Sequence, residues 1–599
     1  MGEASVVQWG SAVRHTPLAS LTLGTEVPLS ISDEADGSLG QNGGSLPVLG
    51  GFVAGGELAW RAAGPTVEVI DPLTGVRKAA WTFGAIMHNA GAKVTNVCGV
   101  GPGAITHVAI AVDLGADRKP QGMVAVLSLH TSRIIRTFHF TYKVTSLCMV
   151  SGGEVSVDPG TLSQELQVAH GLLALGTHHG TLHLLDLALD CKELISDEVS
   201  PASVVQMSVP DPQAETHRIQ ALKRRQHPTL CLSDGMVGGN QFRLIGPDEN
   251  ILYKTPSHLV TVTTVTFLPQ LASLVVGYNF GSFQIINLSS IAVDCASPHE
   301  ENMHPVQSFA LQEPENDPKN FVYLWICRSY GLNDTVGTKS VIGRPALCTM
   351  YAMSYENKVW IEGHGLWYQH LSSISPRFEF EAIGGLGLKG QAAEPSRVFS
   401  AMTVRQATPV AASASSGAVA LTNPDDESGP VPEWSLCLFG WYGGILSHTK
   451  VSVQHYIAVF DINQWYQAHM PSNLSVEESS LCPYMSFHAL DQIPGHITNK
   501  EAVLAAAPKP ASWARHISKC NNDTDWFPAS LSFSAHVLTS EGLMEYQCSS
   551  VQQAALSTIA RTGPAAIVNP EHAYSLASFA GLLSHNDLHS SPQNMTMVC

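Results

Sequence analysis

The stretch at residues 172–187 carries the pattern that most constrains the fold. It contains an apolar run, a turn marked by Gly176 and Gly180, a second apolar run, and Asp186 where that run meets the next turn. Glycine allows the backbone to reverse, and the continuous apolar runs place apolar side chains on both faces of the strands. Both faces must therefore be covered by other parts of the chain, because such a hairpin is not stable alone.

The same unit returns along the chain. Residues 274–288 repeat the two glycines four positions apart, with Asn287 in the place of Asp186, and residues 66–71 and 123–128 match the second half of the unit. A period of roughly 50 residues built from short strands is typical of a β-propeller, in which each blade buries its faces against its neighbours. The repeats therefore predict a mainly β, WD40-like propeller.

The spacing of the turns gives an estimate of the number of blades in this region. The turns lie at positions 71, 128, 186 and 287, so the gaps between them are 57, 58 and 101 residues. The double-length gap predicts one degenerate blade, and residues 241–246 are the best candidate for its strand.

The composition excludes several classes of protein. Of the 599 residues, 44% are hydrophobic and 14% charged, which favours a large buried core over a disordered chain. The net charge of −18 argues against a nucleic-acid-binding propeller surface. The 12 cysteines form no C-x-x-C pair, which favours a reducing, cytosolic or nuclear setting. Neither a signal peptide nor a membrane-spanning apolar window is found, so membrane insertion is not expected.

The chain divides into three parts by pattern. Residues 1–50 predict a flexible arm with one strand, near 21–29, that could close the ring as a clasp. Residues 51–549 predict the propeller, with a flexible insertion rich in Ala, Ser and Pro at 407–432. Residues 550–599 have helical apolar spacing and predict the beginning of an incomplete α-helical domain.

The sequence contains no pattern typical of a catalytic, cofactor or metal site. It has no P-loop, no H-E-x-x-H and no G-x-S-x-G, and the glycines at 99–103 have the wrong spacing for phosphate binding. His178 and His179 lie in a turn whose counterpart in the next repeat is Tyr278-Asn279, so solvated turn histidines are favoured over metal ligands. We therefore expect no enzyme activity and no small-molecule substrate.

Two longer motifs stand out from the blades. Residues 312–320 form a polar loop bounded by prolines and lead into a buried strand, and residues 460–471 form a strand-to-helix junction. In that junction Asp461 can cap the first helical amides, Gln464 stands at the capping-box position, and Trp465 is spaced from Phe460 as in a hydrophobic staple.

Both motifs resemble segments of the ELYS family, the AT-hook-containing nucleoporins also called MEL-28. The hairpins at 172 and 274 and residues 580–584 appear in the corresponding order, so the resemblance spans nearly the whole chain in separate islands. The resemblance implies a seven-bladed propeller followed by an α-helical domain, in a protein that links the Y-shaped scaffold of the nuclear pore to chromatin. This chain lacks most of that helical domain and the basic tail, so we expect a fragment, a short isoform or a truncated gene model.

The hypothesis for function is a non-enzymatic nuclear pore scaffold module that docks on Y-complex nucleoporins and supports post-mitotic pore assembly at the nuclear envelope. Chromatin would be reached only indirectly or through a C-terminal region absent from this sequence. The candidate partner-binding residues come from the two motifs and are Glu313, Glu315, Asn316, Asp317, Trp465, Tyr466 and Met470. The alternatives are a generic propeller adaptor outside the pore, or a propeller enzyme with ionisable residues in its central channel.

Overall fold

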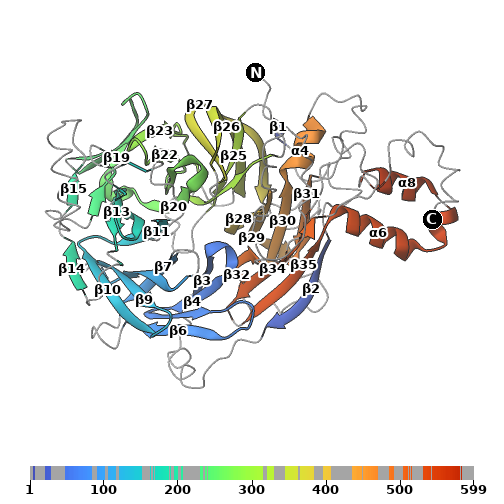
Figure 1. The fold of residues 1–599 in the computed structure, drawn as a ribbon, viewed down its shortest axis with the longest axis horizontal. Coiled ribbons are helices and arrows are strands. Elements are labelled where there is room, and N and C mark those ends of the chain that lie inside the picture. The colour runs from blue at the N-terminus through green and yellow to red at the C-terminus, as the bar shows by residue number, and fades with distance from the viewer. Residues whose placement is uncertain are drawn as a thin grey trace.

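The computed structural model describes the greater part of the chain, shown in Figure 1. The described residues lie mostly within 48–151, 162–187, 229–329, 345–382, 396–405, 435–469, 484–490, 503–515 and 531–582, with short gaps in several of these ranges, together with strands at 5–6, 20–27, 195–199 and 204–206. The predicted insertion at 407–432 and most of the predicted N-terminal arm lie outside the described residues.

Seven of the eight sheets in the described ranges share one plan of four antiparallel strands, and we call these sheets blades one to seven. The strands of each blade are given from the inner strand outward. Blade one consists of β3 (Val48–Val53), β4 (Leu58–Ala63), β5 (Thr66–Ile70) and β6 (Arg77–Thr82), and blade two of β7 (Lys93–Val100), β8 (His107–Asp113), β9 (Gly122–Ser128) and β10 (Arg133–Phe140). Blade three consists of β11 (Val144–Ser151), β12 (Leu172–Thr177), β13 (Leu182–Asp186) and β16 (Thr229–Cys231), and blade four of β20 (Val262–Leu268), β21 (Ser273–Tyr278), β22 (Phe283–Asn287) and β23 (Ala292–Ala296).

Blades five to seven follow the same plan, and the longest strands belong to blades five and six. Blade five consists of β24 (Val306–Gln312), β25 (Phe321–Arg328), β26 (Ala346–Ile361) and β27 (Gly365–Ala382). Blade six consists of β28 (Ser396–Arg405), β29 (Ser435–Ser447), β30 (Lys450–Asp461) and β31 (Met485–Ala489). Blade seven consists of β32 (Val503–Pro508), β34 (Leu531–Thr539), β35 (Leu543–Ser549) and β2 (Ser20–Val27). The outermost strand of blade seven thus comes from the N-terminal part of the chain. It pairs antiparallel with β35, from Ser20 opposite Ser549 to Val27 opposite Leu543.

The inner strands close a ring. Each contacts the next in the order β3, β7, β11, β20, β24, β28 and β32, and β32 contacts β3 again (Figure 1). Each pair of adjacent blades is also joined by its own cluster of buried apolar residues. This arrangement confirms the predicted mainly β propeller fold, because every blade has both faces covered by neighbours.

The prediction of a degenerate blade in the gap between positions 186 and 287 is wrong. Residues 241–246 do form a strand, β18 (Gln241–Ile245), which lies in a three-stranded sheet between β17 (Val237–Gly238) and β19 (Ile251–Pro256). Since β11 contacts β20 directly, this sheet has no place in the ring, and β18 packs instead against the outer strand β23. The gap is long because it contains an inserted sheet between blades three and four.

The two glycines of the repeated hairpin have different roles. Gly180 and Gly281 have φ angles of 77° and 86° and form the turns, as predicted. Gly176 and Gly277 lie inside strands, where a Cβ atom would approach Val262 to 2.3 Å and Val306 to 2.7 Å. These valines belong to the inner strands of the next blades, so the first glycine allows close packing between blades and not a turn.

A threonine near the start of three inner strands links each blade to the next. Thr95, Thr145 and Thr263 each sit at a β-bulge that follows a valine. The Thr263 hydroxyl lies 3.1 Å from the carbonyl oxygen of Gly277 in its own blade and 2.5 Å from that of Val306 in the next blade. Thr145 makes the same pair of contacts one blade earlier. The bulge turns the side chain across the blade boundary.

The remaining elements decorate the ring. Three short strands add in parallel to outer or edge strands: β1 (Ser5–Val6) to β27, β14 (Ile195–Val199) to β10, and β15 (Val204–Gln206) to β16. β33 (Ala514–Arg515) pairs with β34. The 3-10 helices are η1 (Ala54–Gly56), η3 (Ser257–Leu259) and η4 (Pro269–Leu271), and the α-helices are α4 (Ile462–His469), α6 (Val551–Thr562), α7 (Ala565–Val568) and α8 (Pro570–Phe579). No helix within the described ranges is long and apolar enough to cross a membrane.

The helices α6 to α8 follow the last strand and project from the side of the ring (Figure 1). Ser550 begins α6 with a capping box, in which its side chain accepts a hydrogen bond from the Gln553 amide and the Gln553 side chain accepts one from the Ser550 amide. Ala555 is buried against Ile559 and Leu582, whereas Leu556 and Val568 are exposed. The three helices thus bury only a small apolar cluster among themselves.

We predict that Thr263→Val lowers the free energy of unfolding by about 1–2 kcal/mol, because the hydroxyl donor that lies between two buried carbonyl oxygens is lost while the shape of the side chain is kept. Thr263→Ser should retain most of the stability. Thr264→Val is the matched control, since its hydroxyl makes no hydrogen bond within the described residues. Urea denaturation of the three variants tests this, and equal losses for Thr263→Val and Thr264→Val would contradict the role of the bulge threonine.

We predict that the double substitution Thr22→Pro and Leu23→Pro destabilises the whole ring by about 3 kcal/mol. Successive amides in a strand point to opposite edges, so one of these two must donate to β35, and proline removes that donor. Thermal unfolding measures the effect. The control is Gln41→Pro with Asn42→Pro, between β2 and β3, which should unfold at the wild-type temperature; an equal fall there would show that the β2 pairing does not stabilise the ring.

Candidate functional site

The two motifs singled out in the sequence meet at the boundary between blades five and six. Gln312 ends the inner strand β24, and Phe460 lies at the end of β30. The Gln312 side-chain amide donates to the Phe460 carbonyl at 3.5 Å, and its oxygen accepts a hydrogen bond from the Trp325 indole at 2.7 Å. Gln312 and Trp325 are fully buried, so this polar bridge is shielded from water.

Aromatic side chains from both blades pack around this bridge. The ring of Trp325 lies edge-on to that of Phe460, with centroids 4.9 Å apart. Tyr323 makes edge contacts with Trp465 at 5.8 Å and with Tyr466 at 6.2 Å. Such edge-to-face pairs add to the stabilisation from burial. The helix α4 is therefore fixed to blade five as well as to blade six.

The strand-to-helix junction forms as predicted. The Asp461 carboxylate accepts a hydrogen bond from the Asn463 amide at 2.9 Å, and the Asp461 amide donates to the Tyr484 carbonyl at 2.9 Å. The first contact satisfies one of the free amides at the start of α4. Phe460 and Trp465 belong to one buried cluster. The side chain of Gln464, the expected capping-box partner, lies outside the described residues.

The structure places the candidate partner-binding residues in three settings. Glu313 and Trp465 are buried, with exposed fractions of 3% and 7%. Tyr466 is partly exposed and packs against the core cluster of blades five and six. The remaining candidates, Glu315, Asn316, Asp317 and Met470, lie outside the described residues. Trp465 faces inward because its position in the first turn of α4 puts it over Tyr323, so in this structure it positions the helix.

One anchoring residue of this site was not singled out from the sequence. Asn320, at the end of the polar loop, has a φ of 48°, and its carbonyl accepts a hydrogen bond from the Tyr355 amide at 3.2 Å. Its side-chain amide donates to the Glu356 carbonyl at 3.4 Å. An asparagine before a buried strand is typical of a residue with a left-handed backbone. The contacts of Asn320 with β26 could not be predicted, because that strand lies too far along the chain to be identified by spacing.

These elements emerge on one face of the ring. The inner strands run parallel to one another, since Thr95 and Thr145 at the start of one strand each contact the start of the next, at Val144 and Val262. The loop that follows β24, the turn between β26 and β27, the helix α4 and the start of α6 all follow strands that end on the same face. We call this face the exit face.

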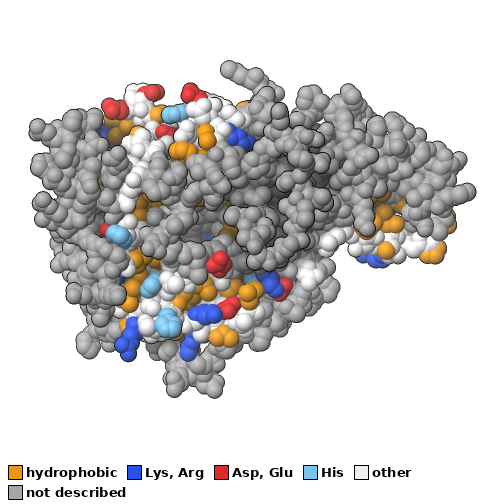
Figure 2. All heavy atoms as spheres, in the orientation of Figure 1, with side chains coloured by type: hydrophobic (Ala, Val, Ile, Leu, Met, Phe, Trp, Pro, Cys, Tyr) orange, Lys and Arg blue, Asp and Glu red, His pale blue; other side chains and the backbone are white. Residues whose placement is uncertain are grey.

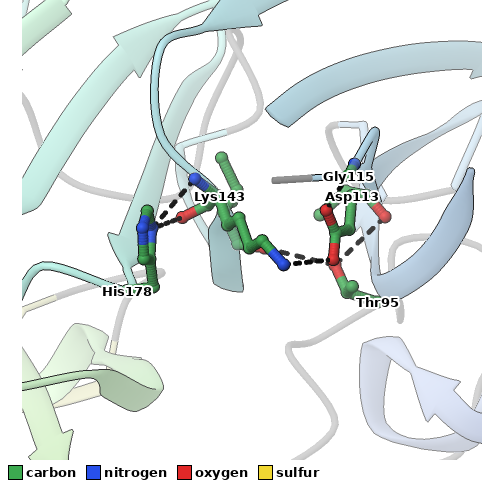
Figure 3. A network of polar contacts seen from close by, with 7 residues as sticks. Thr95, Asp113, Gly115, Lys143 and His178 are labelled. Atoms are coloured by element: carbon green, nitrogen blue, oxygen red, sulfur yellow. Dashed lines mark hydrogen bonds and ion pairs between the residues drawn. The ribbon is translucent and has the colours of Figure 1, made fainter. Parts of the chain in front are cut away.

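The opposite face carries a smaller polar network between blades two and three, shown in Figure 3. The Lys143 ammonium forms an ion pair with Asp113 at 2.9 Å, and the Lys143 amide donates to Nδ1 of His178 at 3.0 Å. Asp113 also accepts a hydrogen bond from the Gly115 amide at 2.9 Å. The ion pair joins the start of β11 in blade three to the end of β8 in blade two and so links the two blades, whereas the His178 contact lies within blade three and the Gly115 contact within blade two.

The histidines of this network are half-buried, which differs from the solvated turn expected from the sequence. The rings of His178 and His179 are in contact, tilted by 37° with their centroids 3.8 Å apart. Burial, followed by the positive charge that His179 would carry, lowers the pKa of His178 to about 4, so it is neutral at pH 7. Among the described residues, no three His, Cys, Asp or Glu side chains are placed to hold a metal ion.

The cysteines along the inner strands serve packing. Burial raises the pKa of the Cys148 thiol to about 11, and its sulfur accepts a hydrogen bond from the Phe267 amide of the next blade at 3.1 Å. A neutral, buried thiol is a poor nucleophile. On the face shown in Figure 2, the described side chains mix both charges with hydrophobic and histidine residues and form no large basic patch.

Comparison with known proteins identifies the family of the propeller. Residues 38–545 match the family model described as the β-propeller of ELYS nucleoporin. Protein ELYS of Xenopus laevis is 25% identical over 544 residues, which cover 88% of this chain and 20% of the relative. Protein ELYS of Homo sapiens is 24% identical over 572 residues, which cover 92% of this chain and 22% of the relative. The chain thus spans about a fifth of the length of these relatives.

Two solved structures show only a distant likeness. The Chaetomium thermophilum Nup170 N-terminal domain in complex with Nup53 aligns over 93% of this chain and 65% of that one, with 9% identity and a TM-score of 0.43. A chain of the mitotic checkpoint complex aligns over 91% of this chain and 96% of that one, with 11% identity and a TM-score of 0.34.

We predict that the ring loses stability as the pH falls from 6.5 towards 4, and that His183 contributes to this loss. Burial lowers the pKa of His183 to about 4. The unfolded chain, with a histidine pKa of about 6.5, binds a proton that the folded chain excludes, which costs about 2 kcal/mol of stability at pH 5 and nothing above pH 7.5.

Denaturation at pH 7.5 and pH 5 measures this effect. In His183→Gln the difference between the two pH values should be about 2 kcal/mol smaller than in wild type. His130→Gln, which alters an exposed histidine, is the control and should keep the wild-type difference. An unchanged difference in His183→Gln would mean that the folded state accommodates the protonated imidazole.

Proposed function

Because the chain belongs to the family of ELYS nucleoporin β-propellers, we propose that it acts as a non-enzymatic scaffold module of the nuclear pore complex. The single observation that carries this proposal is the family match over 38–545, which runs from ahead of β3 into β35 and so spans the ring except for β2 and the end of β35. A propeller whose buried polar groups are used to hold blades together offers a rigid surface, and its described part contains no cluster of His, Cys, Asp or Glu that could hold a metal ion.

The finer proposal concerns the partner and the place of action. The module docks on Y-complex nucleoporins and supports pore assembly at the nuclear envelope after mitosis. Contact with chromatin is proposed to be indirect or to be made through sequence outside this chain, which covers 20% and 22% of the two relatives. The proposed location is the nucleus and the nuclear pore. It is supported by the match to the nucleoporin family model and by the name that both relatives share.

The proposed docking surface is the exit face at the boundary of blades five and six. Its support is that the two motifs with the strongest family resemblance are tied together there by the Gln312 bridge and the Tyr323 contacts. The residues on either side of this loop, Gln312 and Asn320, are held by hydrogen bonds. A loop with fixed ends loses less conformational entropy on binding than a free one.

The energy of docking would come from this loop and from Tyr466, and not from Trp465. A buried tryptophan cannot contribute contact area to a partner without leaving the core. Removing the packing of such a side chain, as in Trp465→Ala, costs about 3–5 kcal/mol of stability. Glu315 and Asp317 instead offer carboxylates to a basic partner surface. Variants that test docking should therefore change the loop and leave the aromatic cluster intact.

The test is proximity labelling in dividing cells with the 599-residue chain as bait, beside the variant Glu315→Lys with Asp317→Lys. The matched control is Glu300→Lys with Glu301→Lys, two exposed neighbouring carboxylates in the connection between blades four and five, with the same change of charge. We expect wild type and control to label Y-complex nucleoporins, and the loop variant to label them several-fold less.

The outcomes separate the function from the surface. Equal labelling by the loop variant and wild type would contradict the docking surface while keeping the pore assignment. Equal loss in both charge variants would show a general effect of charge. If wild type labels no nucleoporin, the scaffold proposal is wrong for this chain. Circular dichroism and thermal unfolding of each purified bait exclude loss of folding as the cause.

A further inference from the structure

The three-stranded sheet of β17, β18 and β19 is an insertion outside the ring, and only one of its faces is used for packing. Phe242 and Leu244 of β18 are buried in the core cluster shared with blades three and four. Phe242 packs against Tyr278, with ring centroids 5.3 Å apart, and Tyr253 of β19 packs against Phe280 at 4.9 Å. The sheet is therefore fixed rigidly to the ring by its inner face.

The outer face of this sheet carries an unfavourable arrangement of charge. Arg243 of β18 and Lys254 of β19 are directly opposite each other in the register, and both are exposed. Like charges at opposed positions destabilise a sheet. Neither side chain forms an ion pair with another described residue. The flanking pair, Gln241 opposite Pro256, is also exposed.

Two positive charges placed together are unusual for this chain, whose net charge is −18. The nearest carboxylates in the sequence, Asp248 and Glu249, lie in the turn that joins β18 to β19, beyond the opposed pair of Ile245 and Ile251. They do not face Arg243 and Lys254 across the strands. The outer face is therefore a local site of positive potential that an acidic group would neutralise.

The strand β19 also has a free edge within the described part of the chain. It pairs with β18 on one side only, and the sheet has three strands where each blade has four. Its residues alternate between exposed and partly buried, and Ile251 and Leu252 are 53% and 40% exposed. A free strand edge offers a row of backbone donors and acceptors to an extended peptide, and the exposed aliphatic side chains offer apolar contact.

From this geometry we infer that an extended acidic segment of a partner protein adds to β19 as the fourth strand of this sheet. Its carboxylates lie on the outer face, where they neutralise Arg243 and Lys254, and its alternate aliphatic side chains lie on the inner face, beside Tyr253 of β19. The partner chemistry is thus a strand with alternating acidic and aliphatic residues. This inference concerns a different surface from the exit face and does not depend on the nuclear pore assignment.

The exposed Lys254 has a second physical explanation, but the positions of Arg243, Ile251 and Leu252 do not fit it. A lysine on an edge strand can discourage pairing with other strands. Here the second charge, Arg243, lies on the central strand β18, where it protects no edge, and Ile251 and Leu252 are left exposed on β19.

The test uses the purified 599-residue chain and a fluorescein-labelled peptide of alternating glutamate and valine, about eight residues long, followed by fluorescence anisotropy. We expect saturable binding that weakens with added salt and that falls roughly tenfold in Arg243→Glu with Lys254→Glu. The matched control, Lys93→Glu with Arg133→Glu, alters two exposed basic residues of blade two and should bind as wild type does.

Two further peptides separate strand addition from simple attraction of charge. A lysine–valine peptide of the same length should not bind, and the glutamate–valine peptide methylated at alternate backbone amides should lose binding, since it cannot form a ladder. Equal binding of the methylated peptide would overturn strand addition. Equal weakening in the blade-two control would overturn the site, and so would binding of the lysine–valine peptide or no binding of any peptide.

Discussion

The structure depends on strands that are apolar on both faces and so must be covered on both sides. In a propeller this requirement is met only when the last blade meets the first, because each end blade of an open ring would expose one apolar face. The seven clusters between adjacent blades are the physical form of this constraint. The seam between blades seven and one has the smallest of them, built on Ala59, Ile70, Leu538 and Leu543, so covalent continuity through β2 matters most there.

Close packing at the centre of the ring is produced by two residue types that act together. Gly176 and Gly277 leave room for the valines of the next inner strand, and Thr145 and Thr263 then reach the carbonyl groups of those valines. Without the glycine the strands could not approach, and without the threonine the carbonyl groups would lack this donor. The repeated pair therefore sets the spacing of successive blades, which in turn decides where the loops of the exit face lie relative to one another.

The sequence predicted those features that depend on local patterns. The hairpins at 172–187 and 274–288 and the cap at Asp461 follow from residues close together in the chain, and the structure contains them. The threonines at 95, 145 and 263 were not singled out from the sequence, because their role depends on a carbonyl group in another blade. The degenerate blade was inferred from length alone, and length does not distinguish an inserted sheet from a blade.

The inward orientation of Trp465 could not be predicted for a similar reason. The spacing from Phe460 shows that the two side chains can share a cluster, but Tyr323, which receives Trp465, comes from the preceding blade. Whether an aromatic residue on a short helix is an anchor for a partner or part of the core is decided by such a distant contact. Glu313 follows the same rule, since it is buried although its neighbours in the sequence form a polar loop.

This burial has a consequence for how the exit face can bind. Since the aromatic residues at the boundary of blades five and six are used to hold α4, the boundary is rigid and its polar loop is fixed at Gln312 and at Asn320. In the proposed docking, the rigid boundary would present the same loop ends to every partner, so specificity would come from the few residues between them. Recognition by a short charged loop on a rigid ring depends on complementary charge more than on apolar area, which makes such an interface sensitive to salt and to single charge changes.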